Sequence, residues 1–384
     1  MREIEAILSS YDEAQKKGNQ CVLATVVHVE GSSYRAAGAR MLVDEYGFMT
    51  GAISGGCLEG DALRKALLAL DQHKSKLITY DTSDEDDAVI GAQLGCNGII
   101  QVLFEPIDPE QSNNPIELLR KAENDDQPVA LVSIFNLDKS KHQTGTTVLV
   151  GNKKEDIIGR LNDQALYKKI KSVAQNALEK QTDHFGEYQS ADETQNAFIE
   201  VISPPPRLVL VGAGNDSQVI SKMAEVLGWD ITVADGRPTH ANKNRFNSCQ
   251  VVVTNPGEIL ENIRINEKTV FVLMTHNYNY DMGVLKLLLK EEQIPYIGIL
   301  GPNKKYQRML DDLKAEGITL SDQQSDKIYA PVGLQLGAET PAEIGLSILS
   351  EIQAVLTDSE VRSLRELEGA IHDKENREFE VIEL

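Results

Sequence analysis

The sequence predicts an α/β protein in which an N-terminal α/β domain is followed by a Rossmann-like domain with a doubly wound parallel sheet. From residue 207 onward, apolar strands alternate regularly with amphipathic helices, as in a parallel sheet that is covered on both faces. The first of these strands opens into a glycine turn, and later ones end in polar or glycine-rich segments. The stiff run Ser203-Pro204-Pro205-Pro206 precedes this pattern and marks a domain boundary.

The length of 384 residues supports more than one domain. We expect the N-terminal domain to span residues 1–203, with a motif-rich part at 1–106 and a middle part at 107–203. The Rossmann-like domain is expected at 207–356, and residues 357–384 are expected to form a peripheral helix and tail.

The charge balance argues against two kinds of partner. The chain carries 38 Lys and Arg against 59 Asp and Glu, and its net charge of −21 opposes binding to nucleic acid or to an anionic membrane surface. No apolar run is long enough to span a bilayer, and the acidic, amphipathic N-terminus is unlike a signal peptide. We therefore expect a cytoplasmic protein whose four cysteines are reduced thiols.

The N-terminal domain is expected to begin with a helix at residues 4–15. Strands at 21–29 and 40–43 and a helix at 62–70 follow. Residues 21–29 are apolar on both faces, which predicts a central strand.

A glycine-rich turn, Ser54-Gly55-Gly56-Cys57, precedes the helix at 62–70. Glycines there can adopt positive φ, and a helix N-terminus adds about half a positive charge, so the turn can bind a phosphate or stabilise a thiolate. Cys57 is then a candidate nucleophile or soft-metal ligand, although Glu59 and Asp61 oppose the charge of a thiolate. The alternative is a tight turn with an inert cysteine.

A second cysteine, Cys96, also lies among glycines, just ahead of a predicted strand at 99–104. The acidic loop 81–87 before it lacks the spacing of an EF-hand and predicts a solvated loop. The middle part carries no motif with a readable function. Its predicted elements are helices at 116–122 and 163–179 and strands at 129–135, 146–150 and 197–202.

The Rossmann-like domain opens with a strand at 207–211 and the turn Gly212-Ala213-Gly214, followed by a helix that contains Ser217 at the third fingerprint position. A second strand ends at Asp235, 23 residues after Gly212, where an acid can bind a ribose hydroxyl of NAD. Because Ser217 replaces the usual Gly or Ala, the fingerprint is incomplete, and the glycines alternatively serve only the turn.

Later strands at 250–254, 269–274 and 296–300 complete the sheet, and His276 follows the second of them at the edge where ligands bind. Thr340, Pro341 and Glu343 predict a capping box that opens a helix at 342–355.

These motifs together resemble those of the XdhC/CoxI family, the accessory factors of xanthine dehydrogenase and related molybdenum hydroxylases. Tyr34 replaces a usual proline and Asn97 a usual glycine. The matching residues are Gly31-Ser32-Ser33 with Arg35, Gly38 and Met41; Gly55-Gly56-Cys57 with Glu59; Cys96 with Gly98, Val102, Glu105 and Pro106; Asp235-Gly236-Arg237-Pro238; Thr275-His276 with Asp281; Gly298 to Lys305; and Ala330 to Ile344.

The resemblance implies a maturation factor that binds molybdenum cofactor (molybdopterin), supports its sulfuration and hands it to a xanthine dehydrogenase-type hydroxylase. A cysteine desulfurase is the implied sulfur donor. The implied cofactor site has Cys57 and Cys96 as soft ligands facing each other, with Arg35 and Arg40 neutralising the pterin phosphate. The family also implies a homodimer, for which the amphipathic N-terminal helix is a candidate surface.

Two other functions are compatible with the sequence. The first is an NAD(P)-dependent oxidoreductase that uses the Rossmann half, and the second is a scaffold with a vestigial nucleotide site. Direct xanthine oxidation is not expected, because four scattered cysteines cannot hold the two [2Fe–2S] clusters of a complete hydroxylase.

Overall fold

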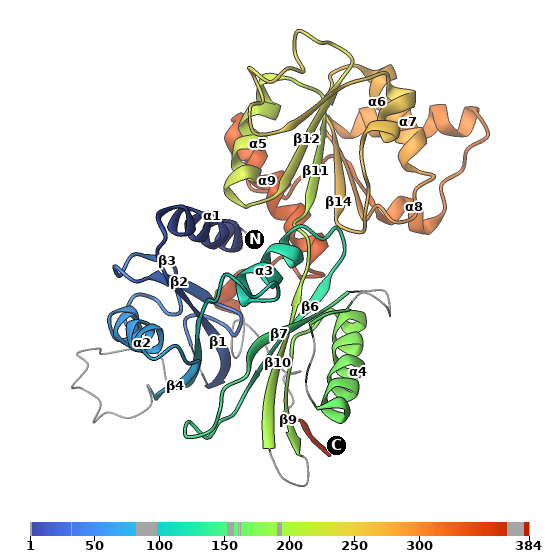
Figure 1. Cartoon of the computed structure of the whole chain (residues 1–384). Coiled ribbons are helices and arrows are strands. Elements are labelled where there is room, and N and C mark those ends of the chain that lie inside the picture. The colour runs from blue at the N-terminus through green and yellow to red at the C-terminus, as the bar shows by residue number, and fades with distance from the viewer. Residues whose placement is uncertain are drawn as a thin grey trace. The chain divides into compact units, whose positions relative to one another are not determined.

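The computed structural model describes residues 2–31, 33–81, 98–151, 157–159, 161, 163–189, 194–366 and 380–383. It divides into two compact units (Figure 1). The N-terminal unit comprises Met1–Pro204 together with His372–Leu384, and the C-terminal unit comprises Pro205–Ile371. The division falls within the proline run after Ser203.

Two sheets build the N-terminal unit. The first is antiparallel with strand order β3-β2-β1-β5-β4, and the second has the order β17-β9-β10-β6-β7-β8. β17 pairs in parallel with β9 and is a strand that the sequence did not predict. The strands are β1 (Cys21–Gly31), β2 (Arg40–Asp44), β3 (Met49–Gly51), β4 (Lys76–Asp81), β5 (Gly98–Pro106), β6 (Val129–Phe135), β7 (Gly145–Val150), β8 (Ile157–Ile158), β9 (His184–Gln189), β10 (Thr194–Ile202) and β17 (Glu380–Glu383).

Helices α2 and α4 each cover one face of one sheet, whereas α1 and α3 pack in a cluster that contains residues of both sheets. Cys21 of β1 packs with α1 and α3, whereas its neighbour Val22 packs under α2, so β1 is a central strand with two buried faces, as predicted. Phe135 and Phe198 of the second sheet pack against Leu103 of the first, and α4 covers the far face of the second sheet. The helices are α1 (Arg2–Lys17), α2 (Glu59–Asp71), α3 (Pro115–Glu123) and α4 (Gln164–Lys180).

The apolar face of α1 is covered within its own unit. Ile7 and Tyr11 are 0% and 4% exposed and belong to a cluster that includes residues of α3 and β2. Contrary to the prediction, this helix therefore needs no second copy of the chain to cover its apolar face.

The C-terminal unit is a six-stranded parallel sheet with the order β13-β12-β11-β14-β15-β16, which confirms the Rossmann-like doubly wound fold. Leu208 and Leu210 of β11 pack with α5 and α9, and the alternating Val209 and Val211 pack with α6 and α7. The strands are β11 (Arg207–Val211), β12 (Asp230–Asp235), β13 (Gln250–Val253), β14 (Thr269–Leu273), β15 (Tyr296–Ile299) and β16 (Ile328–Tyr329). The helices are α5 (Asn215–Val226), η2 (Pro256–Asn262), α6 (Tyr278–Leu288), α7 (Asn303–Ala315), α8 (Asp322–Asp326), α9 (Pro341–Leu356) and η3 (Leu364–Glu366).

The predicted capping box at the start of α9 is present. The Thr340 side chain accepts a hydrogen bond from the Glu343 N–H, and the Glu343 carboxylate accepts one from the Thr340 N–H at 2.8 Å. Among the helices of the described ranges, none combines the length and apolar character that crossing a membrane requires.

Candidate functional site

The glycine turn before α2 is organised by Ser54, which is 5% exposed. Its Oγ accepts hydrogen bonds from the N–H groups of Gly56 (3.2 Å) and Leu58 (3.1 Å) and donates one to the Glu59 carboxylate. Glu59 also accepts from the Ser54 N–H at 2.9 Å. Burial alone would raise the pKa of Glu59, but these hydrogen bonds outweigh it and the pKa is lowered. Glu59 is thus an ionised anchor of the turn.

The turn leaves one side open next to Cys57. Gly56 has a φ of +109°, and an added Cβ there would meet no atom within 4 Å. A Cβ on Gly55 would instead lie 3.2 Å from the ring of Tyr34. Cys57 directly precedes Leu58, the N-cap of α2; it is half-buried, with its Sγ 3.5 Å from Ser54 Oγ. The arrangement offers a thiol and an open backbone to a bulky ligand.

The second predicted ligand, Cys96, lies outside the described residues. In the part of the chain that is described, no group of three or more His, Cys, Asp or Glu side chains is placed to hold a metal ion. Of the two predicted sulfur ligands, Cys57 is therefore the one whose surroundings the structure describes.

The arginines expected near this turn are both engaged with carboxylates. Arg35 contacts Glu3 of α1 and keeps 30% of its side chain exposed. Arg40 is only 4% exposed, pairs with Glu200 of β10 and donates to the Gly38 carbonyl at 2.9 Å. Burial disfavours its charge, but Glu200 outweighs burial and the pKa of Arg40 is raised. Assigning Arg40 to the pterin phosphate is therefore a prediction that we correct, because its charge is buried and already paired.

A third titratable group, Glu105 of β5, lies buried in the same unit. It is 3% exposed and accepts hydrogen bonds from Thr146 N–H (2.6 Å) and Thr146 Oγ1 (2.9 Å). Burial raises its pKa from 4.5 to about 7, against the opposing effects of Thr146 and Arg40.

We expect this carboxyl group to make the N-terminal unit less stable as the pH rises from about 4.5 to about 7. In that window the folded chain keeps the proton and the unfolded chain releases it, at a cost of up to about 3 kcal/mol. Urea unfolding at several pH values measures the effect. Glu105→Gln keeps the size of the side chain, and it should flatten the slope; an unchanged slope would rule out Glu105 as its source.

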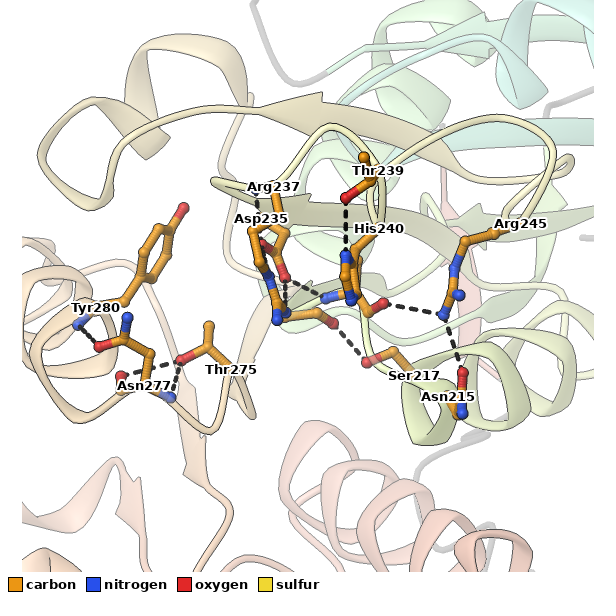
Figure 2. Close-up of polar contacts among 12 residues, drawn as sticks. Asn215, Ser217, Asp235, Arg237, Thr239, His240, Arg245, Thr275, Asn277 and Tyr280 are labelled. Atoms are coloured by element: carbon orange, nitrogen blue, oxygen red, sulfur yellow. Dashed lines mark hydrogen bonds and ion pairs between the residues drawn. The ribbon is translucent and has the colours of Figure 1, made fainter.

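In the C-terminal unit, the turn after β11 lies close to the end of β14. Gly212 has a φ of +122°, and a Cβ there would lie 2.6 Å from the Met274 carbonyl oxygen, so only glycine fits. Gly214 is the N-cap of α5, and a Cβ added to it would meet nothing within 4 Å. Ser217 is fully buried and donates to the Gly212 carbonyl (Figure 2). Ser217 therefore braces the turn, while Gly214 borders open space.

Asp235, the acid expected to bind a ribose, is already saturated (Figure 2). Its Oδ2 accepts from the Ala213 N–H (2.8 Å) and Arg237 Nη2 (2.7 Å), and its Oδ1 accepts from the Arg237 N–H and Nε, both at 2.9 Å. Burial would raise the pKa of Asp235, but the hydrogen bonds from Arg237 and Ala213 outweigh it, and the pKa is lowered. A carboxylate has about four lone-pair sites, so none is left for a ribose hydroxyl.

Two arginines, Arg237 and Arg245, lie beside the turn after β11. Arg237 is half exposed, and Arg245 donates to the Ala213 carbonyl (3.2 Å) and to Asn215 Oδ1 (3.1 Å), across the start of α5. The Arg245 Nε is buried and has no hydrogen-bond partner among the described residues. We call Gly212, Gly214, Asp235, Arg237 and Arg245 the Rossmann site. Neither arginine was assigned a role from the sequence, although Arg237 stands in the Asp-Gly-Arg-Pro motif.

His276 is exposed at the end of β14 with a φ of +57°. Its neighbour Thr275 donates to Asp281 Oδ1 at 2.6 Å, and Asp281 Oδ2 accepts from Lys305 Nζ at 2.7 Å. Lys305 also donates to the Leu300 carbonyl at 2.8 Å. Two sequence motifs, Thr275-His276 with Asp281 and Gly298 to Lys305, thus meet in one buried ion pair that fixes the loops after β14 and β15.

These features define a two-unit α/β protein with a cysteine turn in its N-terminal unit and a Rossmann site in its C-terminal unit. Residues 14–81 match the XdhC and CoxI family, and residues 208–352 match the XdhC Rossmann domain. The chain belongs to the XdhC and CoxI family.

Three similar proteins have informative names. A Bacillus subtilis (strain 168) protein, named as a probable subunit of xanthine dehydrogenase, is 33% identical over 91% of this chain and 95% of its own. The Escherichia coli (strain K12) molybdenum cofactor insertion chaperone PaoD is 25% identical over 89% of this chain and 86% of its own. A crystal structure of a protein from Bacillus halodurans, described as a xanthine dehydrogenase, superposes with a TM-score of 0.72 at 26% identity and covers 94% of this chain and 98% of that one.

Proposed function

We propose that this protein is a maturation factor that binds molybdenum cofactor as cargo and inserts it into a xanthine dehydrogenase-type molybdenum hydroxylase. The family and the name of PaoD support this class of function. The observation that carries the proposal is the half-buried Cys57 beside the open backbone of Gly56, at the start of α2. Molybdenum and its dithiolene are soft partners, and a thiolate is the protein's soft ligand.

Within this proposal, the protein's own residues have separate tasks. Ser54 and Glu59 hold the turn so that the Cys57 thiol stays beside open space. Arg35 is the arginine of the predicted pair that retains exposure, and Glu3 orients it. Arg40 takes no part in cargo binding, because its partner Glu200 holds it inside the unit.

We expect Cys57→Ala to lower transfer of the cofactor to an apo-hydroxylase by at least about tenfold, since metal sites commonly lose that much even when a supporting residue is removed. Cys57→Ser should fall similarly, because it keeps the size and hydrogen bonding but removes the soft sulfur. The readouts are cofactor retained after gel filtration and activity of the reconstituted hydroxylase. Cys249→Ala, at a buried cysteine of the other unit, is the matched control. Transfer at the wild-type rate by both Cys57 variants would reject this role.

Three parts of the family resemblance stay predictions. They are a sulfuration step on the bound cofactor, a cysteine desulfurase as its sulfur donor, and a homodimer. Sedimentation of the purified chain over a range of concentrations tests the last of these, and a constant monomer mass would contradict it.

We also propose that the protein does not oxidise xanthine by itself, despite the names of two of its relatives. A complete hydroxylase carries two [2Fe–2S] clusters, and each cluster needs four ligands. The whole chain has four cysteines, of which Cys21 and Cys249 are buried. Xanthine oxidation by the purified chain without added partners would refute this.

A second candidate function, an NAD(P)-dependent redox step, rests on the Rossmann site. Gly214 leaves space at the N-terminus of α5, where a pyrophosphate can accept backbone hydrogen bonds, and the buried, unpartnered Arg245 Nε borders the same turn. The residues therefore fit a dinucleotide, which would supply hydride chemistry when bound. Calorimetry that detects neither NADH nor NADPH binding would remove this function.

A further inference from the structure

In the Rossmann site, the acid at the position that normally recognises the ribose of NAD is occupied by internal hydrogen bonds. In that role an acid at the end of the second strand accepts hydrogen bonds from ribose hydroxyls. Here Asp235 is 4% exposed and its oxygens already accept four hydrogen bonds, three of them from Arg237. A ribose hydroxyl finds no vacant acceptor on this side chain.

Arg237 presents donors in place of that acceptor. A guanidinium has five N–H donors, and the pair with Asp235 uses the Nε donor and one Nη2 donor. The remaining donors belong to a side chain that is 50% exposed. Because Asp235 fixes the guanidinium plane, an incoming phosphate meets an oriented, charge-assisted donor set.

A second anion position lies on the other side of the same turn. There the Arg245 side chain contacts Asn215, the first residue of α5 (Figure 2). Gly214, the N-cap of the same helix, borders open space. This is where the pyrophosphate of a dinucleotide binds in a Rossmann fold. Asp216 in the first turn of α5 repels the negative charge of a pyrophosphate. This repulsion affects NAD(H) and NADP(H) equally, because both carry the pyrophosphate.

We propose that the Rossmann site selects a dinucleotide with a phosphate on the adenosine ribose, NADP(H), over NAD(H). The inference rests on the proposed nucleotide binding and adds its specificity. The reason is that the site has two separate anion positions. NAD(H) carries only the pyrophosphate and fills one of them, whereas NADP(H) carries an additional phosphate on the adenosine ribose and fills both. Arg237 is the specificity residue, and Asp235 is the positioning residue that orients it.

The test is a calorimetric titration of the full chain with NADPH, NADH, 2′-phospho-ADP-ribose and ADP-ribose. We expect the phosphorylated member of each pair to bind at least about tenfold more tightly, as a charge-assisted bidentate contact allows. Arg237→Met should remove this advantage. It should also strengthen NADH binding, because it releases the Asp235 carboxylate for the ribose hydroxyls.

Two further variants separate specificity from binding and folding. Arg362→Met removes an arginine of similar exposure, 48%, that lies after α9, and should change neither affinity. Gly214→Val fills the open space at the start of α5 and should abolish binding of both dinucleotides. The fluorescence of Trp229, the one tryptophan of the chain, checks that the C-terminal unit is folded in each variant.

The outcomes distinguish dinucleotide specificity from nucleotide binding itself. Equal or tighter binding of NADH to the wild-type chain would overturn the specificity and leave the nucleotide site standing. Binding of neither dinucleotide would overturn both, yet it leaves the cofactor-transfer function, which depends on Cys57, untouched. An unchanged preference in Arg237→Met would show that this arginine is not the selector.

Discussion

Replacing Arg40 by methionine is expected to destabilise the N-terminal unit by about 3–5 kcal/mol, the usual cost of leaving a buried carboxylate without its partner. The variant leaves the Glu200 carboxylate, whose side chain is 16% exposed, without its positively charged partner. Glu105 loses a neighbouring positive charge that lowers its pKa. The effect should appear in the urea transition followed by circular dichroism.

Two controls distinguish charge burial from lost packing. The double variant Arg40→Met with Glu200→Met removes both charges and should recover much of the stability, because a hydrophobic pair can replace a buried ion pair at little cost. Arg64→Met, on a side chain that is 73% exposed, should cost no more than about 1 kcal/mol. A loss in Arg40→Met no larger than that in Arg64→Met would show that the buried pair is not needed.

The C-terminal fold could be predicted because each of its signals is local. Strands β11, β12 and β14 follow from apolar runs, and the turn at Gly212 follows from glycines at a strand end. The right-handed crossovers of parallel strands then favour a doubly wound sheet, whereas the strand order is known only from the structure. In contrast, β17 is four residues long and lies in a segment without an apolar period, so nothing in the sequence identified it.

In the candidate sites, the sequence predicted the features that depend on residues close together in the chain. The turn before Cys57 is visible as glycines between a strand and a helix. The pairing of Arg40 with Glu200 is not visible, because the two residues are 160 positions apart and belong to different sheets. For the same reason, Asp281 and Lys305 were recognised in separate motifs, and their ion pair became evident only from the fold.

Replacing Lys305 by methionine is expected to destabilise the C-terminal unit by about 3–5 kcal/mol. Asp281 is 0% exposed, and Lys305 Nζ lies 2.7 Å from its carboxylate. Without Lys305, the carboxylate keeps Thr275 as a donor but loses the opposing charge, so the loops after β14 and β15 lose their common anchor. Trp229 lies in the core of this unit, and its fluorescence follows the unfolding directly.

Trp229 fluorescence also distinguishes unfolding of the C-terminal unit from unfolding of the N-terminal unit. Lys305→Met should shift the Trp229 transition. Arg40→Met acts on the N-terminal unit and should leave that transition within about 1 kcal/mol of the wild type, because Trp229 lies in the core of the C-terminal unit. Lys304→Met, at the exposed neighbour, should have little effect on either transition. Adding Asp281→Asn to Lys305→Met removes the unpaired charge while an amide oxygen can still accept from Thr275, so the double variant should be more stable than Lys305→Met alone. If the double variant were the less stable of the two, the stabilisation would come from packing of the lysine stem and not from the ion pair.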